Sequence, residues 1–322
     1  MIKISIERFR SGLEDDWDHF VRCSSNGTIF HERKFLSYHI DRLFTDHSLL
    51  IREDDQVIAV LPASEVDSTF YSHPGASYGW IVFDKIGFKK MDAIYSAIEE
   101  YCIKRNLESI FCIPTPHVYY NNSNQILDYL FHLKNYSCEE VYISSIIDLR
   151  PDAKDKIDKR KKRYINSLIN NSDISIEEST DIETFYPILC NNKLKHSVKP
   201  THSLNELIKL QDLYPDKIKL FLTFNKNRVI GGSVVFAANR NTSLLFYNMV
   251  CEEFRSMQIG SYQIYHVMDW SMDHGLKYLD LGVSQMHGTS KPLDPKESLI
   301  SFKEQFGAKA LVRTAYKKNI LK

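Results

Sequence analysis

The sequence has no excess of charge of either sign. Its 322 residues include 41 Lys and Arg and 41 Asp and Glu, so the formal net charge is zero. Such a chain has no overall field to attract nucleic acid or an anionic membrane, although local basic clusters are compatible with this balance. We therefore expect no nucleic-acid or membrane partner, and partners must be inferred from particular sites.

Long apolar runs are absent too. No stretch reaches the roughly 18 apolar residues of a membrane-spanning helix. Charged residues interrupt the apolar runs of the first segment, MIKISIERFR, which does not fit a signal peptide. Hydrophobic residues make up 43% of the chain, enough to fill real cores. We expect a globular, soluble, cytoplasmic protein.

Metal-binding and nucleotide-binding motifs are also missing. The cysteines have no metal spacing, and several lie in apolar runs such as SIFCIP, where a thiol packs as a small hydrophobic side chain. There is no HExxH, no paired CxxC, no GxGxxG after a strand and no Walker loop. Zinc hydrolysis, dinucleotide redox chemistry and ATP use are therefore unsupported, and we expect no metal.

The chain does contain a repeated order of elements. Residues 48–83 and 219–250 each give strand, polar turn, strand and a further apolar stretch. An amphipathic helix pattern follows each set, and then a polar stop and a short strand, over residues 92–114 and 261–283. This order predicts two related domains of the α/β (α+β) class.

A basic segment separates the two repeats. In residues 150–179, RPDAKDKIDKRKKRYINSLINNSDISIEES, a proline is followed by a basic helix pattern and the stop signal NNSD. We place the boundary here, with domains at 1–150 and 151–322. Seven of the residues from Lys154 to Arg163 are basic. They form either a solvated helix face or a basic rim that attracts phosphates.

The segment after the strand-like run of the second repeat has features of a phosphate-binding loop. The first amides of a helix are unpaired and carry partial positive charge, so a strand-to-helix loop suits a phosphate. Gly260 allows close approach of the backbone, and Arg255 stands just ahead as a charge partner. A plain strand-to-helix turn has the same spacing. The candidate binding residues are Arg255, Met257, Gln258, Ile259, Gly260 and Ser261.

The stretch EFRSMQIGSYQIYHVMDWSMDHGLKYLDLG resembles the cofactor-binding region of the GCN5-related N-acetyltransferase (GNAT) superfamily. The family pattern is Arg or Gln, two residues, Gly, one residue, and Gly or Ala. Arg255 and Gly260 match this pattern, whereas Gln258 occupies the first glycine position.

A wider set of motifs resembles the tandem-domain branch that includes the Fem-type, or nonribosomal, peptidyltransferases. The motifs are SHPGASYGWIVF, RKKRYINSLINN, KPTHSLNEL, YLDLGVS and SFKEQFGAK, in that order. The resemblance implies two GNAT-like domains, each a mixed, largely antiparallel sheet flanked by helices. Only the second domain would carry the acyl-CoA site, because the first repeat has FDKIGFKK where the phosphate loop is expected.

The resemblance implies an acyl-CoA donor whose thioester the acceptor amine attacks directly, without a covalent enzyme intermediate. Such chemistry needs a proton acceptor and a group that stabilises the oxyanion. Asp280, in YLDLGVS, is a catalytic candidate, but it can equally bind backbone amides at a strand end. His202, in KPTHSLNEL, is a second candidate, but it can equally belong to a helix cap. Water is the third.

Four further residues are candidates for substrate binding. Tyr247 and Asn248 end a strand just before the loop, which would place them near the acyl carbonyl. Tyr78, in GASYGW, would face the cleft between the halves, and Lys303, in SFKEQFG, would bind a phosphate or carboxylate of the acceptor. The alternatives are packed tyrosines and a solvated lysine.

Three functions are compatible with these features. The first is an acyl-CoA-dependent N-acyltransferase whose acceptor is a nucleotide-linked amino sugar for bacterial surface polysaccharide, such as O-antigen or capsule. The second is a Fem-like transfer of an amino acid from tRNA to a peptidoglycan precursor, although no long heptad-patterned arm is present. The third is a catalytically silent scaffold. The sequence gives no indication of oligomeric state.

Overall fold

The computed structural model describes residues 3–195, 197–286 and 291–320 of the chain. These residues form two compact units, one of Met1–Val141 with Arg313–Lys322 and one of Tyr142–Val312. Strands β9 (Ser137–Asp148) and β15 (Lys309–Asn319) each contribute residues to both units. The predicted division at residue 150 places the chain end in the second domain, whereas the contacts of residues 313–320 lie in the first unit.

The first unit combines two groups of strands with helices. A four-stranded antiparallel sheet has the order β1-β3-β4-β7, and a second run has the order β15-β8-β6-β5-β2. Only β6 and β8 are parallel in this second run. The strands are β1 (Ile4–Arg8), β2 (Thr45–Asp46), β3 (Leu49–Glu53), β4 (Gln56–Leu61), β5 (Ser64–Val66), β6 (Thr69–Tyr71), β7 (Val82–Phe83) and β8 (Ser109–Cys112). The helices are α1 (Glu14–Cys23), α2 (Arg33–Leu36), α3 (Phe88–Lys104) and α4 (Ile126–Leu133).

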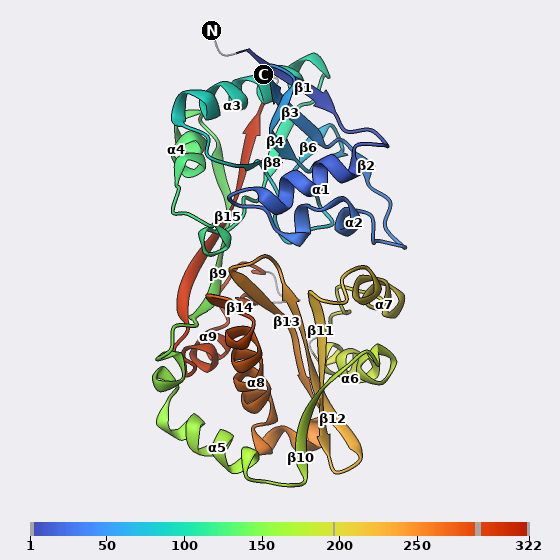
Figure 1. Cartoon of the computed structure of the whole chain (residues 1–322), viewed down its shortest axis with the longest axis vertical. Helices are drawn as coiled ribbons and strands as arrows, with labels where there is room; N and C mark the ends of the chain where they lie inside the picture. The colour runs from blue at the N-terminus through green and yellow to red at the C-terminus, as the bar shows by residue number, and fades with distance from the viewer. Residues whose placement is uncertain (1–2, 196, 287–290, 321–322) are drawn as a thin grey trace. The chain divides into compact units, whose positions relative to one another are not determined.

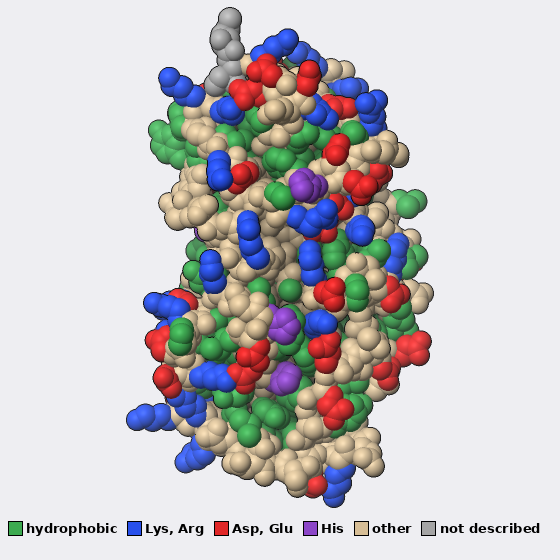
Figure 2. Space-filling model, viewed as in Figure 1, with side chains coloured by type: hydrophobic (Ala, Val, Ile, Leu, Met, Phe, Trp, Pro, Cys, Tyr) green, Lys and Arg blue, Asp and Glu red, His purple; other side chains and the backbone are tan. Residues whose placement is uncertain are grey.

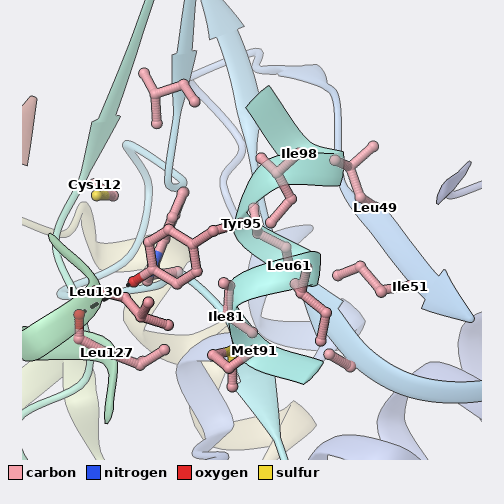
Figure 3. Packing of buried hydrophobic residues seen from close by; sticks show 14 of the residues in the cluster. Leu49, Ile51, Leu61, Ile81, Met91, Tyr95, Ile98, Cys112, Leu127 and Leu130 are labelled. Carbon is pink, nitrogen blue, oxygen red and sulfur yellow. Dashed lines mark hydrogen bonds between the residues drawn. The ribbon is translucent and has the colours of Figure 1, made fainter. Parts of the chain in front are cut away.

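The core of the first unit forms where α3 packs against β3 and β4. Buried positions recur along α3 at helical spacing, at Met91, Ile94, Tyr95, Ile98 and Cys102. Figure 3 shows side chains of this face of α3 beside Leu49, Ile51 and Leu61 of the two strands.

The second unit is a mixed sheet of order β10-β11-β12-β13-β14-β9. Its first four strands form an antiparallel meander, β14 is parallel to β13, and β9 is antiparallel to β14. The strands are β10 (Ile174–Ser179), β11 (Ile218–Asn225), β12 (Arg228–Ala237), β13 (Thr242–Val250) and β14 (Tyr278–Val283). The helices are α5 (Lys159–Ile169), α6 (Ile182–Leu194), α7 (Leu204–Leu213), α8 (Ile259–Asp273) and α9 (Glu297–Glu304). The predicted mixed, largely antiparallel sheets flanked by helices are confirmed.

Two adjacent glycines on β12 show how closely helices approach both faces of this sheet. A Cβ at Gly231 would lie 2.7 Å from Nε2 of Gln263 on α8, and one at Gly232 would lie 2.9 Å from the Phe185 ring of α6. Successive strand residues point to opposite faces. Helix α8 therefore covers one face and α6 the other, as Figure 1 shows.

Both units contain the repeated order predicted from the sequence, which is a hairpin, a further strand, a helix and a last strand. The hairpin β3-β4 is followed, after the short strands β5 and β6, by β7, α3 and β8, and the hairpin β11-β12 is followed by β13, α8 and β14. In the described residues, no helix is long and apolar enough to cross a membrane. The face drawn in Figure 2 carries Lys and Arg interspersed with Asp and Glu, as the balanced composition predicts.

Candidate functional site

The candidate site lies where two parallel strands of the second unit diverge. β13 pairs with β14 only over Thr242–Leu244, opposite Tyr278–Asp280. Beyond this point the edge of β13 that faces β14 has no ladder partner in the described chain. A pocket of about 590 Å³ opens there, and we call it the fork pocket. It is lined by Lys161, Asn192, Lys193, Asn248, Met249, Val250, Arg255, Gln258, Gly260, Ser261, Gln285, Lys296, Ser298, Leu299 and Phe302.

The loop predicted from the sequence forms one wall of the fork pocket. Its 3-10 turn, Glu252–Met257, leads into α8, which begins at Ile259. Arg255, Gln258, Gly260 and Ser261 line the pocket. Met257 and Ile259 instead pack into an apolar cluster that includes Leu168, Ile230 and Val250. The loop thus has one side that faces the pocket and one side that packs into the apolar cluster.

Gln258 adopts the backbone conformation that explains the glycine of the family pattern. Its φ is +62°, in the left-handed region that favours glycine. The side chain that glycine would lack accepts a hydrogen bond through Oε1 from Lys161 Nζ, at 2.7 Å. Where a glycine would leave the backbone uncovered, the Gln258 side chain instead links the loop to Lys161 of α5.

The fork pocket has a strong charge asymmetry. Four of its lining residues are basic, Lys161, Lys193, Arg255 and Lys296, and none is acidic. Arg255 has an exposed ion pair with Glu252 at 3.6 Å. Burial lowers the pKa of Lys161 and of Lys193, because desolvation disfavours the ammonium. A pocket of this kind in a chain of zero net charge is suited to an anionic ligand.

Lys161 is a site residue that the sequence reasoning did not single out. Its Nζ also donates to Ser261 Oγ at 3.2 Å and lies 4.7 Å from the centre of the Phe302 ring. It shares the buried face of α5 with Ile165 and Leu168, at helical spacing. That spacing within a basic run was the available signal, because a lysine on the apolar face of a helix is directed inward.

Asn248 and Tyr247 lie side by side on β13 but face different surroundings. Asn248 lines the fork pocket, where its Nδ2 donates to Gly260 O at 3.1 Å and its Oδ1 accepts from Ser233 Oγ at 3.0 Å. Tyr247 is buried, and its hydroxyl lies 3.0 Å from His202 Nδ1. Desolvation raises the pKa of Tyr247 to about 12. The His202 and Tyr247 pair therefore lies outside the residues that line the pocket.

Asp280 and Lys303 meet at the end of β14. Asp280 is fully buried, and its Oδ1 accepts from Ser144 Oγ at 2.8 Å and from Gly282 N at 2.7 Å. Lys303, on α9, donates from Nζ to Gly282 O at 2.7 Å, Val283 O at 3.1 Å and Ser284 Oγ at 2.8 Å. Both residues thus fix the irregular part of β14 at which its register against β9 shifts.

Two substitutions of Asp280 distinguish a structural role, in which the carboxylate holds the backbone, from a catalytic role as the proton acceptor. Asp280→Asn keeps Oδ1 as an acceptor and should leave the free energy of unfolding within about 1 kcal/mol of the parent. Asp280→Ala leaves one buried and one partly buried hydrogen-bond donor without this acceptor and should lower the free energy of unfolding by about 2 kcal/mol. Urea unfolding measures both values. A stable Asn variant that loses more than 100-fold in acyl transfer, about 2.7 kcal/mol, would instead identify Asp280 as the proton acceptor.

Tyr78 belongs to the first unit. It is fully buried there, with ring contacts to Phe30 and Tyr119 and with the Arg313 guanidinium 5.8 Å from its ring centre. The residues that line the fork pocket all belong to the second unit. Among the described residues no group of three or more His, Cys, Asp or Glu is placed to hold a metal ion.

Comparisons with known proteins concern the fold and the second unit. Residues 192–288 match the family model described as an acetyltransferase (GNAT) domain. No curated protein matches the sequence. Among solved structures, FemX has a TM-score of 0.73 at 13% identity, with 97% of each chain covered. A tandem GNAT protein from the clavulanic acid biosynthesis pathway has a TM-score of 0.54 at 9% identity, with 99% of each chain covered.

A conserved protein of unknown function from Bacteroides thetaiotaomicron has the same fold, with a TM-score of 0.60 at 12% identity over 98% of this chain and 99% of that one. The second unit therefore carries an acyltransferase domain of the GNAT type. The chain as a whole has the tandem-domain fold that it shares with FemX and the tandem GNAT protein, as the sequence predicted, and the match to the GNAT domain model covers residues 192–288.

Proposed function

We propose that the chain is an N-acyltransferase that takes its acyl group from acyl-CoA bound in the fork pocket. The observation that carries the proposal is the set of four basic residues, without an acidic one, next to the first amides of α8. Ser261 N already donates to Gln258 O at 2.9 Å, so the amides of Ile259 and Gly260, together with the partial charge of the helix, are the ones that suit a pyrophosphate. Arg255, Gln258, Gly260 and Ser261 form the phosphate side of the site.

The reaction that we propose is direct aminolysis of the thioester. The amine nitrogen bonds to the carbonyl carbon, the bond from carbon to sulfur breaks, and the thiolate leaves with the electron pair and takes up a proton. The unpaired edge of β13 beyond Leu244 offers backbone groups to the acyl chain and to the developing oxyanion. Water accepts the amine proton, because an amine that is partly neutral near pH 7 needs no strong base.

Asp280 and His202 enter this proposal as positioning residues. Asp280 is the last residue of β14 that pairs with β13, and it holds Gly282, where the register of β14 against β9 shifts. His202 holds the Tyr247 hydroxyl, next to Asn248 in the pocket wall. Tyr247 and Lys303 act in the same way, since their polar atoms are engaged within the second unit.

The acceptor that we propose is a nucleotide-linked amino sugar. An amine follows from the GNAT-type domain, and the sugar nucleotide is the finer part of the proposal. A panel of nucleotide-linked amino sugars and free amino sugars, assayed for CoA release, tests it. Release with free amino sugars alone would exclude a nucleotide requirement.

A Fem-like transfer from aminoacyl-tRNA is the second candidate. The observation that favours it is Gln258, which replaces the first glycine of the CoA loop pattern and binds Lys161. An RNA end also carries phosphates that basic residues neutralise. The two donors therefore share the charge requirement of the fork pocket and differ in the ligand that binds.

Calorimetric titration with CoA, followed by the same titration with total tRNA, distinguishes the candidates. We expect saturable binding of CoA and none of tRNA. Binding of tRNA without CoA would favour the Fem-like reaction in its place. Binding of neither would favour the catalytically silent scaffold. Thermal unfolding with and without CoA gives an independent measure, because a ligand that binds only the native state raises the melting temperature.

A further inference from the structure

A second hollow adjoins the fork pocket on the other side of Lys161 and Gln258. Its volume is about 350 Å³. It is lined by Asp158, Arg160, Lys161, Tyr164, Gln258 and Gln305, and we call it the side hollow. Lys161 and Gln258 line both spaces, so their hydrogen bond lies at the boundary between the two.

The two basic groups of the side hollow, Arg160 and Lys161, are available to an anion. Arg160 is exposed, has no ion pair within the described chain, and places Nε 3.2 Å from the Tyr164 hydroxyl, with its guanidinium 5.7 Å from the centre of that ring. In the part of the chain that the structure describes, Lys161 Nζ donates to the neutral acceptors Gln258 Oε1 and Ser261 Oγ. The one carboxylate, Asp158, is engaged as the cap of α5, where it accepts from the amides of Arg160 and Lys161 at 2.9 and 3.2 Å.

The basic run of α5 is therefore divided between two roles. Lys159, Lys162 and Arg163 line neither space, and Lys162 is 3.8 Å from the carboxylate of Asp155. Arg160 and Lys161 line the side hollow, beside an aromatic ring. A guanidinium binds phosphate through paired N–H groups, and a tyrosine ring offers a stacking face.

We propose that the side hollow binds a phosphate on the nucleotide end of the acyl donor, with Arg160 as its charged ligand and Tyr164 beside the nucleoside. Lys161 lies at the boundary between the two spaces and then contacts the donor as well. Its Nζ donates to a phosphate oxygen in place of Gln258 Oε1. This inference rests on the proposed function, because it requires an acyl donor that carries a nucleotide. The ligand chemistry is a phosphate attached to a nucleoside, which either the 3′-phosphate of CoA or the phosphodiester of an RNA end supplies.

Calorimetry with CoA and with 3′-dephospho-CoA tests the proposal, because the two ligands differ only in that phosphate. We expect the parent protein to bind CoA about tenfold more tightly, the effect of one charge-assisted contact. Arg160→Gln should remove this preference by weakening CoA and leaving 3′-dephospho-CoA unchanged. Arg163→Gln is the control, since it removes the same charge from the same helix outside both spaces and should keep the preference. Arg160 is exposed, so folding should not be affected.

The outcomes separate this inference from the proposed function. If the parent binds CoA but Arg160→Gln keeps the full preference, or if the parent has no preference, the side hollow is not the phosphate site although CoA is the donor. If a short single-stranded RNA ending in CCA binds in place of CoA and Arg160→Gln weakens it while Arg163→Gln does not, the phosphate site holds and the CoA donor fails. Binding of neither ligand overturns both.

Discussion

Gly260→Asp is expected to weaken CoA binding by about 100-fold or more without destabilising the fold. Gly260 is the second residue of α8 and lines the fork pocket, so a carboxylate there would face the pyrophosphate. Two like charges 4 Å apart repel by about 4 kcal/mol at the effective dielectric constant of a protein surface, and 100-fold in affinity is about 2.7 kcal/mol. Calorimetry with CoA measures the loss.

The structure predicts that this variant folds well. A Cβ at Gly260 would meet Asn248 Nδ2 at 3.6 Å and Val250 Cγ2 at 3.7 Å, which are ordinary contacts. An acidic residue in the first turn interacts favourably with the helix dipole by about 0.3–1 kcal/mol, and replacing a helical glycine adds a comparable gain. Thermal unfolding should therefore show an unchanged or slightly raised melting temperature.

Gly260→Asn is the matched control, because it has nearly the same size and no charge. We expect it to weaken CoA binding much less than the aspartate does. Equal losses in the two variants would mean that bulk at this position matters more than charge. A well-folded aspartate variant with unchanged CoA affinity would place the pyrophosphate away from the start of α8.

The sequence was sufficient for features that depend on neighbouring residues. The repeat of hairpin, strand, helix and strand follows from local periodicity, and the structure has it in both units. The loop before α8 was found in the same way, because a polar turn with Gly260 separates two periodic segments. Strand β15 was harder to assign, since its division between the units depends on contacts with β8, about 200 residues away in sequence.

The sequence did not show which polar residues of the site are structural and which are open to a ligand. Asp280 and Lys303 have the residue types of a catalytic or binding group, yet both are buried with their polar atoms engaged at Gly282. The partner of Lys161 lies 97 positions away. A single sequence does not show which polar side chains satisfy a buried backbone and which remain open to a ligand, because the distinction depends on long-range packing.

Lys303→Met is expected to lower the free energy of unfolding of the second unit by about 3 kcal/mol. The side chain is 6% exposed, and its Nζ is bound by two carbonyl oxygens and one hydroxyl at the end of β14. Methionine keeps most of the volume of the side chain but leaves these acceptors unpaired. Each charge-assisted hydrogen bond is worth about 1.5–3 kcal/mol, and the removal of a buried charge offsets part of the sum.

Urea unfolding of the parent and the variant measures this difference, with Lys309→Met as the control. Lys309 is exposed on β15, so its replacement should change stability by less than about 0.5 kcal/mol. Helix α9 supplies part of the wall of the fork pocket through Ser298, Leu299 and Phe302, and Lys303 ties that helix to β14. Loss of stability with reduced CoA affinity would support the positioning role. A raised KM for the acceptor at unchanged stability would instead show that Lys303 binds the acceptor directly.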